Sequence, residues 1–192
     1  FIGDQLQDVI TQLIETGEAT NCKDGGRLNV GVQTLPKLAK DATDRNRTSP
    51  FAFTGNKFEF RMVASSASIG TANTVLNTIV ADVLCEMADE LEKAQDFDQA
   101  VHDLIKKTLT EHQRIIFNGN GYSEEWVKEA ERRGLPNIKS TVDAIPALVT
   151  DKAIKLFEKH HVFSAAELHS RMEIMYESYA KAINIEAKTM IS

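Results

Sequence analysis

The run from Asp44 to Arg61, DRNRTSPFAFTGNKFEFR, concentrates the residues whose types and spacing are able to do chemistry. It opens on alternating charge and amide groups and ends in a short strand-like segment. In a strand, side chains alternate between two faces with a period of two. Lys57, Glu59 and Arg61 therefore share one face, and aromatic residues occupy the other. Such a row of alternating charge suits an anion- or metal-binding cavity, and it also suits a solvated outer face, which alternation alone favours.

The elements that would position this run are a few strands and many helices. Apolar alternation predicts strands near Arg27–Val32 and Lys57–Val63. Apolar spacings of three and four predict helices over most of the remaining chain. The fold class expected is therefore α+β and mostly helical. The helices expected cover about residues 5–16, 72–93, 101–109, 142–149, 152–160 and 164 onward, with a short helix after Ser123.

Three helix starts carry capping signals. Asp4 is placed to cap the first helix with Gln7 completing a capping box, and Ser164 pairs in the same way with Glu167. Ser123 is placed to cap the short helix that contains Trp126, the single tryptophan, which we interpret as a packing anchor. The last helix continues an apolar stripe to the chain end. That stripe predicts an intramolecular core, with a subunit contact as the alternative.

Composition excludes several classes of partner. The chain has 192 residues and a formal net charge of −6, which gives no reason to expect nucleic acid or an anionic membrane. No apolar run approaches the roughly 18 residues that a spanning helix needs, and no leader segment is recognisable. The start at Phe1 and the end within a helical pattern suggest a piece of a longer protein. Cys22 and Cys85 are expected to be buried, reduced thiols in a cytoplasmic protein.

The five histidines form no metal-ligand spacing. His160 and His161 are adjacent, and adjacent positions on a helix do not share a face. We therefore expect no functional histidine.

The segment NRTSPFAFTGNKFEFR, Asn46 to Arg61, resembles the Asn-Arg-Ser/Thr … Lys/Arg-x-Glu-x-Arg segment of glutamine synthetases, in the form of their type III branch. FNGNGYSEEWVKEAERRG, Phe117 to Gly134, and INIEAKTM, Ile183 to Met190, are similar to the same branch. The likeness covers nearly the whole chain, but only part of such an enzyme. It implies residues 1–95 as the C-terminal part of the catalytic domain, with a few antiparallel strands of its barrel. Residues 96–192 would be a helical C-terminal extension.

The resemblance also implies an activity. Glutamine synthetases make glutamine from glutamate, ammonia and ATP through a γ-glutamyl phosphate, with two divalent metals, Mg²⁺ or Mn²⁺, at each site. The family further implies a large ring-shaped homo-oligomer. Such chemistry needs carboxylates for the metals and fixed cations for the phosphoryl group and the substrate carboxylate.

Roles carry over residue by residue. Glu59 resembles the metal-ligand glutamate, Arg61 the arginine that holds substrate glutamate, and Arg47 the catalytic arginine acting on the phosphoryl group. Asn46 falls with the substrate-binding residues, and Lys57 stands where the family has a basic residue near the nucleotide phosphates.

The chain departs from the family pattern in two places. Ala52 stands where shorter members carry a second arginine, and the usual catalytic flap glutamate has no clear counterpart, with Asp41 and Asp44 the nearest carboxylates. The remaining metal ligands lie upstream in the family, so this polypeptide alone is expected to be inactive. Two alternatives stay open: a ligase that uses another amine, and a non-catalytic assembly module built on the helices from Asp96 to Ser192.

Overall fold

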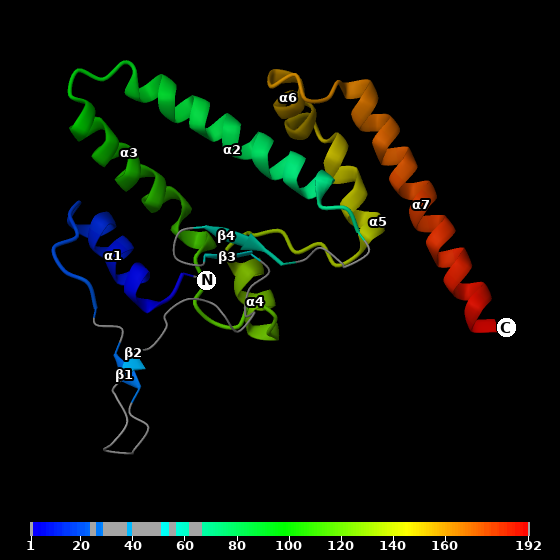
Figure 1. Cartoon of the computed structure of the whole chain (residues 1–192), viewed down its shortest axis with the longest axis horizontal. Helices are drawn as coiled ribbons and strands as arrows, with labels where there is room; N and C mark the ends of the chain where they lie inside the picture. The colour runs from blue at the N-terminus through cyan, green and yellow to red at the C-terminus, as the bar shows by residue number, and fades with distance from the viewer. Residues whose placement is uncertain are drawn as a thin grey trace. The chain divides into compact units, whose positions relative to one another are not determined.

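The computed structural model describes residues 2–23, 26–28, 38–39, 51–53, 57–61 and 67–191. Most of this part of the chain is helical, as expected (Figure 1). In order, the elements are α1 (Asp4–Glu15), β1 (Arg27–Leu28), β2 (Leu38–Ala39), β3 (Phe51–Phe53), β4 (Phe58–Phe60), α2 (Gly70–Leu91), α3 (Phe97–His112), the 3-10 helix η1 (Gln113–Ile115), α4 (Glu124–Arg132), α5 (Thr141–Ala144), the 3-10 helix η2 (Ile145–Val149), α6 (Asp151–Lys159) and α7 (Ala165–Ile191).

The strands form two short antiparallel pairs. β1 pairs with β2, and β3 pairs with β4 in a register that sets Phe51 opposite Phe60 and Ala52 opposite Glu59. Both predicted strand regions thus contain a strand, although residues 29–37 and 62–66 lie outside the described residues. The pairing is antiparallel as expected, but two isolated pairs do not establish the expected barrel.

The chain divides into two compact units. Unit 1 comprises Phe1–Ser68 and Glu90–Pro136, and unit 2 comprises Ile69–Asp89 and Asn137–Ser192. Each of these units combines two separate stretches of the chain, whereas the boundary expected after residue 95 divides the sequence at one point. That boundary stays a prediction.

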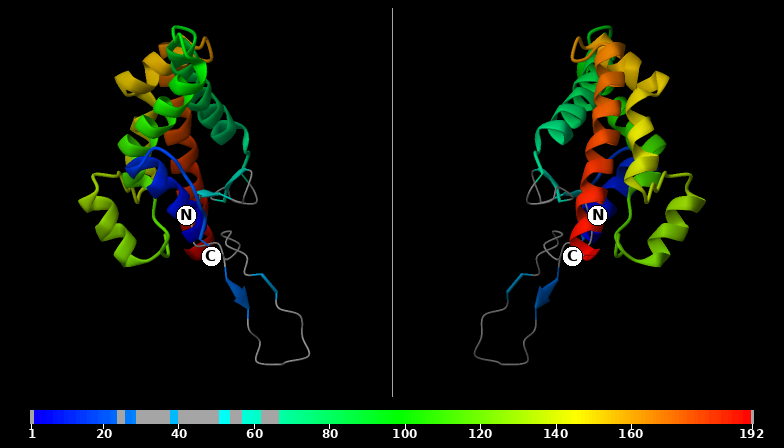
Figure 2. Two further views of the ribbon diagram at one scale, coloured as in Figure 1. Left: turned by 90° about the vertical axis from the view of Figure 1, so that its left-hand side faces the viewer. Right: turned by 90° about the vertical axis from the view of Figure 1, so that its right-hand side faces the viewer.

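In unit 1, α1 packs against α3, and the two helices lie close together in Figure 1 and in the left view of Figure 2. The residues that lead into α1 are held by hydrogen bonds to a side chain far along the sequence. Oδ1 of Asn118 accepts the backbone N–H groups of Ile2 and Gly3, both at 3.1 Å. The expected cap at Asp4 is wrong: Gly3 is the N-cap, without a side-chain hydrogen bond, and Asp4 is the first helical residue. A glycine has no side chain that could cap the first turn, and Asn118 instead holds the two residues that lead into α1.

The block that contains Trp126 is held by an ion cluster at the end of α4. Glu129 accepts two hydrogen bonds from Arg132, each 2.7 Å long, and a third from Nε of Arg133. Nη1 of Arg133 also donates to the carbonyl oxygen of Ile116 at 2.7 Å, and its guanidinium lies 5.8 Å from the Trp126 ring centroid. The cluster therefore fastens α4 to the segment that follows η1.

Trp126 itself stacks on Phe117, with ring centroids 4.5 Å apart. Ser123 caps α4 as expected, accepting from the N–H of Trp126 at 3.3 Å. The contacts agree with the interpretation of Trp126 as a packing anchor. The Phe117 ring also covers Gly119, where an added Cβ would come within 2.5 Å of the ring.

Unit 2 has its core where η2, α6 and α7 meet, and each contributes one buried side chain: Ile145, Phe157 and Leu168. The predicted capping box at the start of α7 is confirmed. Ser164 and Glu167 exchange hydrogen bonds, with Glu167 Oε2 2.8 Å from the Ser164 backbone nitrogen and 2.9 Å from its hydroxyl. These hydrogen bonds hold the pKa of Glu167 below its usual value, because they favour the ionised carboxylate.

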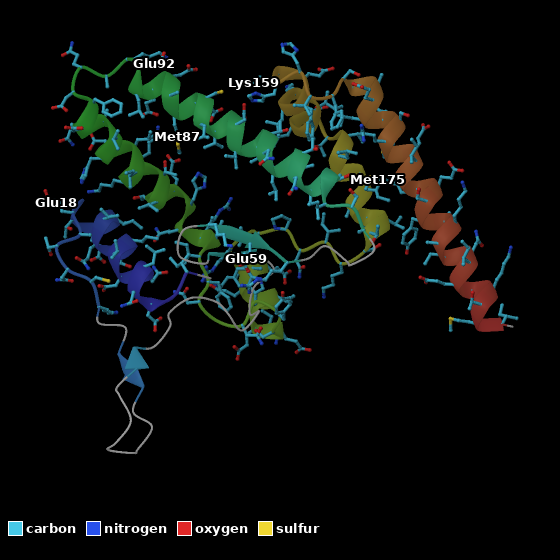
Figure 3. All side chains as sticks on the ribbon, in the orientation of Figure 1. Glu18, Glu59, Met87, Glu92, Lys159 and Met175 are labelled. Carbon is cyan, nitrogen blue, oxygen red and sulfur yellow. The ribbon has the colours of Figure 1, made fainter. Side chains whose placement is uncertain are left out.

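The stripe of α7 is core only near its start. Met175, Tyr179 and Ile183, which continue the stripe beyond Leu168, are exposed. The expectation of an intramolecular core therefore fails for α7 from about Met175 onward, a position that Figure 3 labels. Helical periodicity identifies an apolar face but not whether a neighbouring element covers it.

The α2 helix is joined to the end of α6 by one carboxylate. Oδ1 of Asp82 lies 2.6 Å from Lys159 Nζ and 2.8 Å from His160 Nε2. The hydrogen bond from Lys159, and to a smaller extent that from His160, holds the pKa of Asp82 below its usual value. The hydrogen bond to Asp82 raises the pKa of Lys159. His160 thus has a structural contact that no local sequence signal announced.

Cys22 and Cys85 are free thiols, as expected, but both are exposed, so their predicted burial is wrong. Across the described ranges, no helix combines the length and apolar character that crossing a membrane requires.

We predict that Asn118→Ala lowers the free energy of unfolding by about 1–2 kcal/mol, the usual consequence of leaving partly buried donors without an acceptor. Hydrogen exchange of the Ile2 and Gly3 amides should accelerate, and mass spectrometry of the N-terminal peptide measures this. Asn118→Asp is the matched control, since it keeps the acceptor and adds a negative charge at the positive end of α1. If both variants exchange at the same rate, the side-chain oxygen at position 118 is not what protects the Ile2 and Gly3 amides.

A second prediction concerns pH. The hydrogen bonds from Arg132 and then Arg133 lower the pKa of Glu129 from 4.5 to about 2. Because the folded pKa is depressed, the stability that the carboxylate contributes is present above its ordinary pKa and is lost as pH falls through about 2. Glu129→Gln should therefore destabilise the chain at neutral pH, and its deficit should shrink across this window. Denaturant unfolding at a series of pH values, followed by Trp126 fluorescence, measures the difference.

Glu131→Gln is the control, because it removes an exposed charge from the same helix. A Glu129→Gln deficit that stays constant from neutral pH to below about pH 2 would show that the carboxylate's ionisation is not what holds α4 in place.

Candidate functional site

The candidate site is the charged face of β4. The residues on either side of the strand follow the pleat, so positions 57, 59 and 61 lie on the same face. Contacts bear this out: Glu59 touches both of its charged neighbours, and Figure 3 labels it on the strand. The predicted common face is therefore confirmed.

Arg61 forms a close ion pair with Glu59. Its Nε and Nη2 both donate to Oε2 of Glu59, at 3.1 and 3.0 Å. A guanidinium offers this kind of planar, permanently charged fork, and charge-assisted hydrogen bonds are stronger than neutral ones. The Arg61 side chain is 16% exposed, so this ion pair is partly withdrawn from water.

Lys57 makes a looser contact with the same carboxylate. Its Nζ lies 4.0 Å from Oε1 of Glu59, and its side chain is 67% exposed. At that distance and exposure the ammonium acts as a nearby point charge that solvent screens. Glu59 therefore has a strong contact on one oxygen and a weak one on the other.

The cross-strand register sets position 52 opposite the strand residue that carries the carboxylate: Ala52 pairs with Glu59 in the β3–β4 ladder. Within the described residues, Glu59 forms its ion pairs with Lys57 and Arg61, which lie on either side of β4.

Two of the predicted site residues, Asn46 and Arg47, lie outside the described residues, as do the carboxylates Asp41 and Asp44. Their roles stay predictions. Of the five predicted site residues, the structure thus brings three together: Lys57, Glu59 and Arg61.

The carboxylate of Glu59 is a hard oxygen donor of the kind that Mg²⁺ and Mn²⁺ prefer, and its side chain is 40% exposed, so a cation from solvent can reach it. One carboxylate supplies one ligand position. Among the described residues, no three or more His, Cys, Asp or Glu side chains come together in a way that could hold a metal. These residues therefore fit a contribution to a metal site and do not make a complete one.

One feature of the site was open to sequence reasoning and was missed. Spacing of two along a strand already implied that Glu59 and Arg61 share a face, yet their ion pair was not anticipated. The signal for this ion pair was the placement of opposite charges two positions apart, because residues two apart on a strand are neighbours on one face.

Comparison with known proteins gives the family. Residues 100–192 match the model of the glutamine synthetase C-terminal domain. Over 99% of its length, the chain is 44% identical to a type-3 glutamine synthetase of Dictyostelium discoideum, of which it covers 26%. It is 41% identical to a glutamine synthetase of Butyrivibrio fibrisolvens and 34% identical to one of Bacteroides fragilis strain YCH46, with 27% of each covered.

The chain therefore spans about a quarter of the length of these relatives. The matches run through the β4 face as well as the helices, since they extend over nearly every residue. On these grounds residues 100–192 belong to the glutamine synthetase C-terminal domain family, and the chain is similar over 99% of its length to proteins named glutamine synthetase.

Proposed function

We propose that this chain works as part of a longer cytoplasmic enzyme that forms glutamine from glutamate and ammonia, using ATP and passing through a γ-glutamyl phosphate. The observation that carries the proposal is the Glu59–Arg61 pair on one strand face, in a chain similar along nearly its full length to proteins named glutamine synthetase. When bound, Mg²⁺ or Mn²⁺ would neutralise the charge of the transferred phosphoryl group.

Each residue has a role in this proposal. Glu59 supplies one carboxylate ligand to a divalent metal. Arg61 orients the carboxylate of the glutamate substrate, which its planar fork suits. Lys57 lies beside the nucleotide phosphates as a point charge. Arg47 stabilises the transferred phosphoryl group, and its neighbour Asn46 binds the substrate. Position 52 carries no charge, so the phosphate site must draw its remaining cations from outside β3.

A different role is favoured by one observation. From Ile174 onward, α7 exposes apolar side chains, among them Ile183 and Ile185, and exposed apolar surface is typical of contact sites. The rival function is a non-catalytic assembly module, in which residues 96–192 mediate formation of a homo-oligomer. The large ring-shaped oligomer of the proposed enzyme would use the same surface, so the two proposals differ at Glu59. A ligase that uses a larger amine remains the alternative within enzymes.

The test is ATP-dependent γ-glutamyl hydroxamate formation by the full-length protein that contains this chain. Glu59→Ala should lower the rate about 100-fold or more, because a metal supplies several kcal/mol of transition-state stabilisation and each 1.4 kcal/mol or so is a factor of ten. Glu177→Ala is the control: it removes an exposed partner of Lys181 on α7, and such pairs contribute little. A Glu59→Ala enzyme that keeps its rate, with its oligomer intact, would favour the assembly module. Comparing ammonia with larger amines decides between the two ligases.

The isolated chain should be inactive and bind Mg-ATP more weakly than the micromolar range. A two-metal site needs several carboxylates, and Glu59 contributes one. Titration calorimetry of the 192-residue chain measures the affinity. Micromolar or tighter binding would mean that these residues hold a nucleotide site of their own.

A further inference from the structure

Arg61 binds the two oxygens of the Glu59 carboxylate unequally. Its Nε and Nη2 both donate to Oε2, at 3.1 and 3.0 Å, whereas a fork that faced the carboxylate symmetrically would give one N–H group to each oxygen. Oε1 therefore receives neither of these hydrogen bonds. The ammonium of Lys57 lies 4.0 Å from Oε1, beyond hydrogen-bond distance, on a side chain that is 67% exposed.

The two hydrogen bonds also restrict the rotation of the carboxylate. The last torsion of a glutamate side chain is broad and roughly two-fold, so a fully solvated carboxylate points its oxygens in many directions. Here two N–H groups in one rigid plane meet at Oε2, and the Arg61 side chain that carries them is only 16% exposed. Glu59 itself is 40% exposed, so Oε1 is presented to a cation from solvent in a defined direction.

We propose that Arg61 is a positioning residue for the metal site: it holds Oε2 of Glu59 so that Oε1 binds the divalent cation, and both contacts exist at once. Carboxylates that bind metals are commonly hydrogen-bonded in this way by groups that do not touch the metal. This inference rests on the proposed function, because it needs Glu59 to be a metal ligand. It concerns the two N–H groups that face Glu59, and the substrate role proposed for Arg61 has a test of its own.

The charge of Arg61 and its geometry have opposite effects on metal affinity. Its positive charge repels a cation bound to the same carboxylate, whereas its fork orients the oxygen that binds this cation. Arg61→Lys separates the two effects, because it keeps the charge and removes the planar fork. Lys57 lies too far from Oε1 to orient it, so its charge contributes repulsion alone. Loss of Lys57 should therefore not weaken metal binding.

The experiment measures Mn²⁺ binding to the full-length protein that contains this chain, by electron paramagnetic resonance, without nucleotide or glutamate. Arg61→Lys should weaken Mn²⁺ binding about 10-fold or more, the usual consequence of changing a group that holds a metal ligand. Lys57→Gln is the matched control on the other side of Glu59, and it should bind Mn²⁺ as tightly as the wild type or more tightly. Unchanged or tighter binding in Arg61→Lys overturns the proposal, and so does an equal loss in Lys57→Gln.

A double-mutant cycle distinguishes an action through Glu59 from a general structural role of Arg61. Glu59→Gln keeps one uncharged oxygen that can bind a metal, but its other terminal atom is an amide nitrogen, which cannot accept hydrogen bonds from Arg61. In this background Arg61→Lys should therefore change Mn²⁺ affinity much less than it does in the wild type. The same loss in both backgrounds would mean that Arg61 supports the strand and does not position the carboxylate, which overturns the proposal.

Circular dichroism and sedimentation establish that each variant keeps its fold. If Arg61→Lys does not fold, Arg61→Gln replaces it in the cycle. Loss of the positive charge then favours Mn²⁺ in both backgrounds, and loss of the fork opposes it only where the carboxylate is present. Arg61→Gln should therefore be less favourable to Mn²⁺ binding in the wild-type background than in the Glu59→Gln background, and equal effects overturn the proposal.

Failure of the proposed function is a separate result, since the wild type would then make no γ-glutamyl hydroxamate. The KM for glutamate tests the substrate role of Arg61. A residue that only binds substrate would raise this KM in Arg61→Lys and leave Mn²⁺ affinity unchanged. A protein that makes hydroxamate but binds Mn²⁺ normally in Arg61→Lys keeps the function and loses this inference.

Discussion

The pleat of β4 sets the geometry on which any chemistry of this chain depends. Side chains two apart on a strand stand next to each other on one face, and here the sequence places a cation, an anion and a cation at three such positions. The anion in the middle is contacted from both sides, and the tighter contact is made by the guanidinium, whose fork matches a carboxylate. The strand thus holds its charged groups within reach of one another before any ligand binds.

How much of this arrangement followed from sequence depends on the range of each interaction. The caps at Ser123 and Ser164 were predictable, because an N-cap acts on backbone groups two or three residues away. The common face of Lys57, Glu59 and Arg61 was predictable for the same reason. Asn118 was not, because its hydrogen bonds to Ile2 and Gly3 join residues more than 100 positions apart.

Burial was harder still to predict. The apolar periodicity of α2 and α7 correctly located long helices, yet Ile79, Val80 and Leu84 of α2 are exposed, like the second half of the α7 stripe. Periodicity reports that a helix has an apolar face, and whether that face is covered depends on elements that the periodicity does not specify. The contact of Asp82 with His160 was missed for a related reason, since it joins elements 78 positions apart.

The two cations beside Glu59 hold it unequally. The Arg61 side chain is 16% exposed and makes two charge-assisted hydrogen bonds to one oxygen of Glu59, whereas the Lys57 side chain is 67% exposed and lies 4.0 Å from the other oxygen. Water screens an exposed pair strongly and a partly buried pair much less, so the contact with Arg61 contributes more to the position of the carboxylate. The oxygen that faces Lys57 is therefore the one at which a ligand from solvent meets the weaker competition.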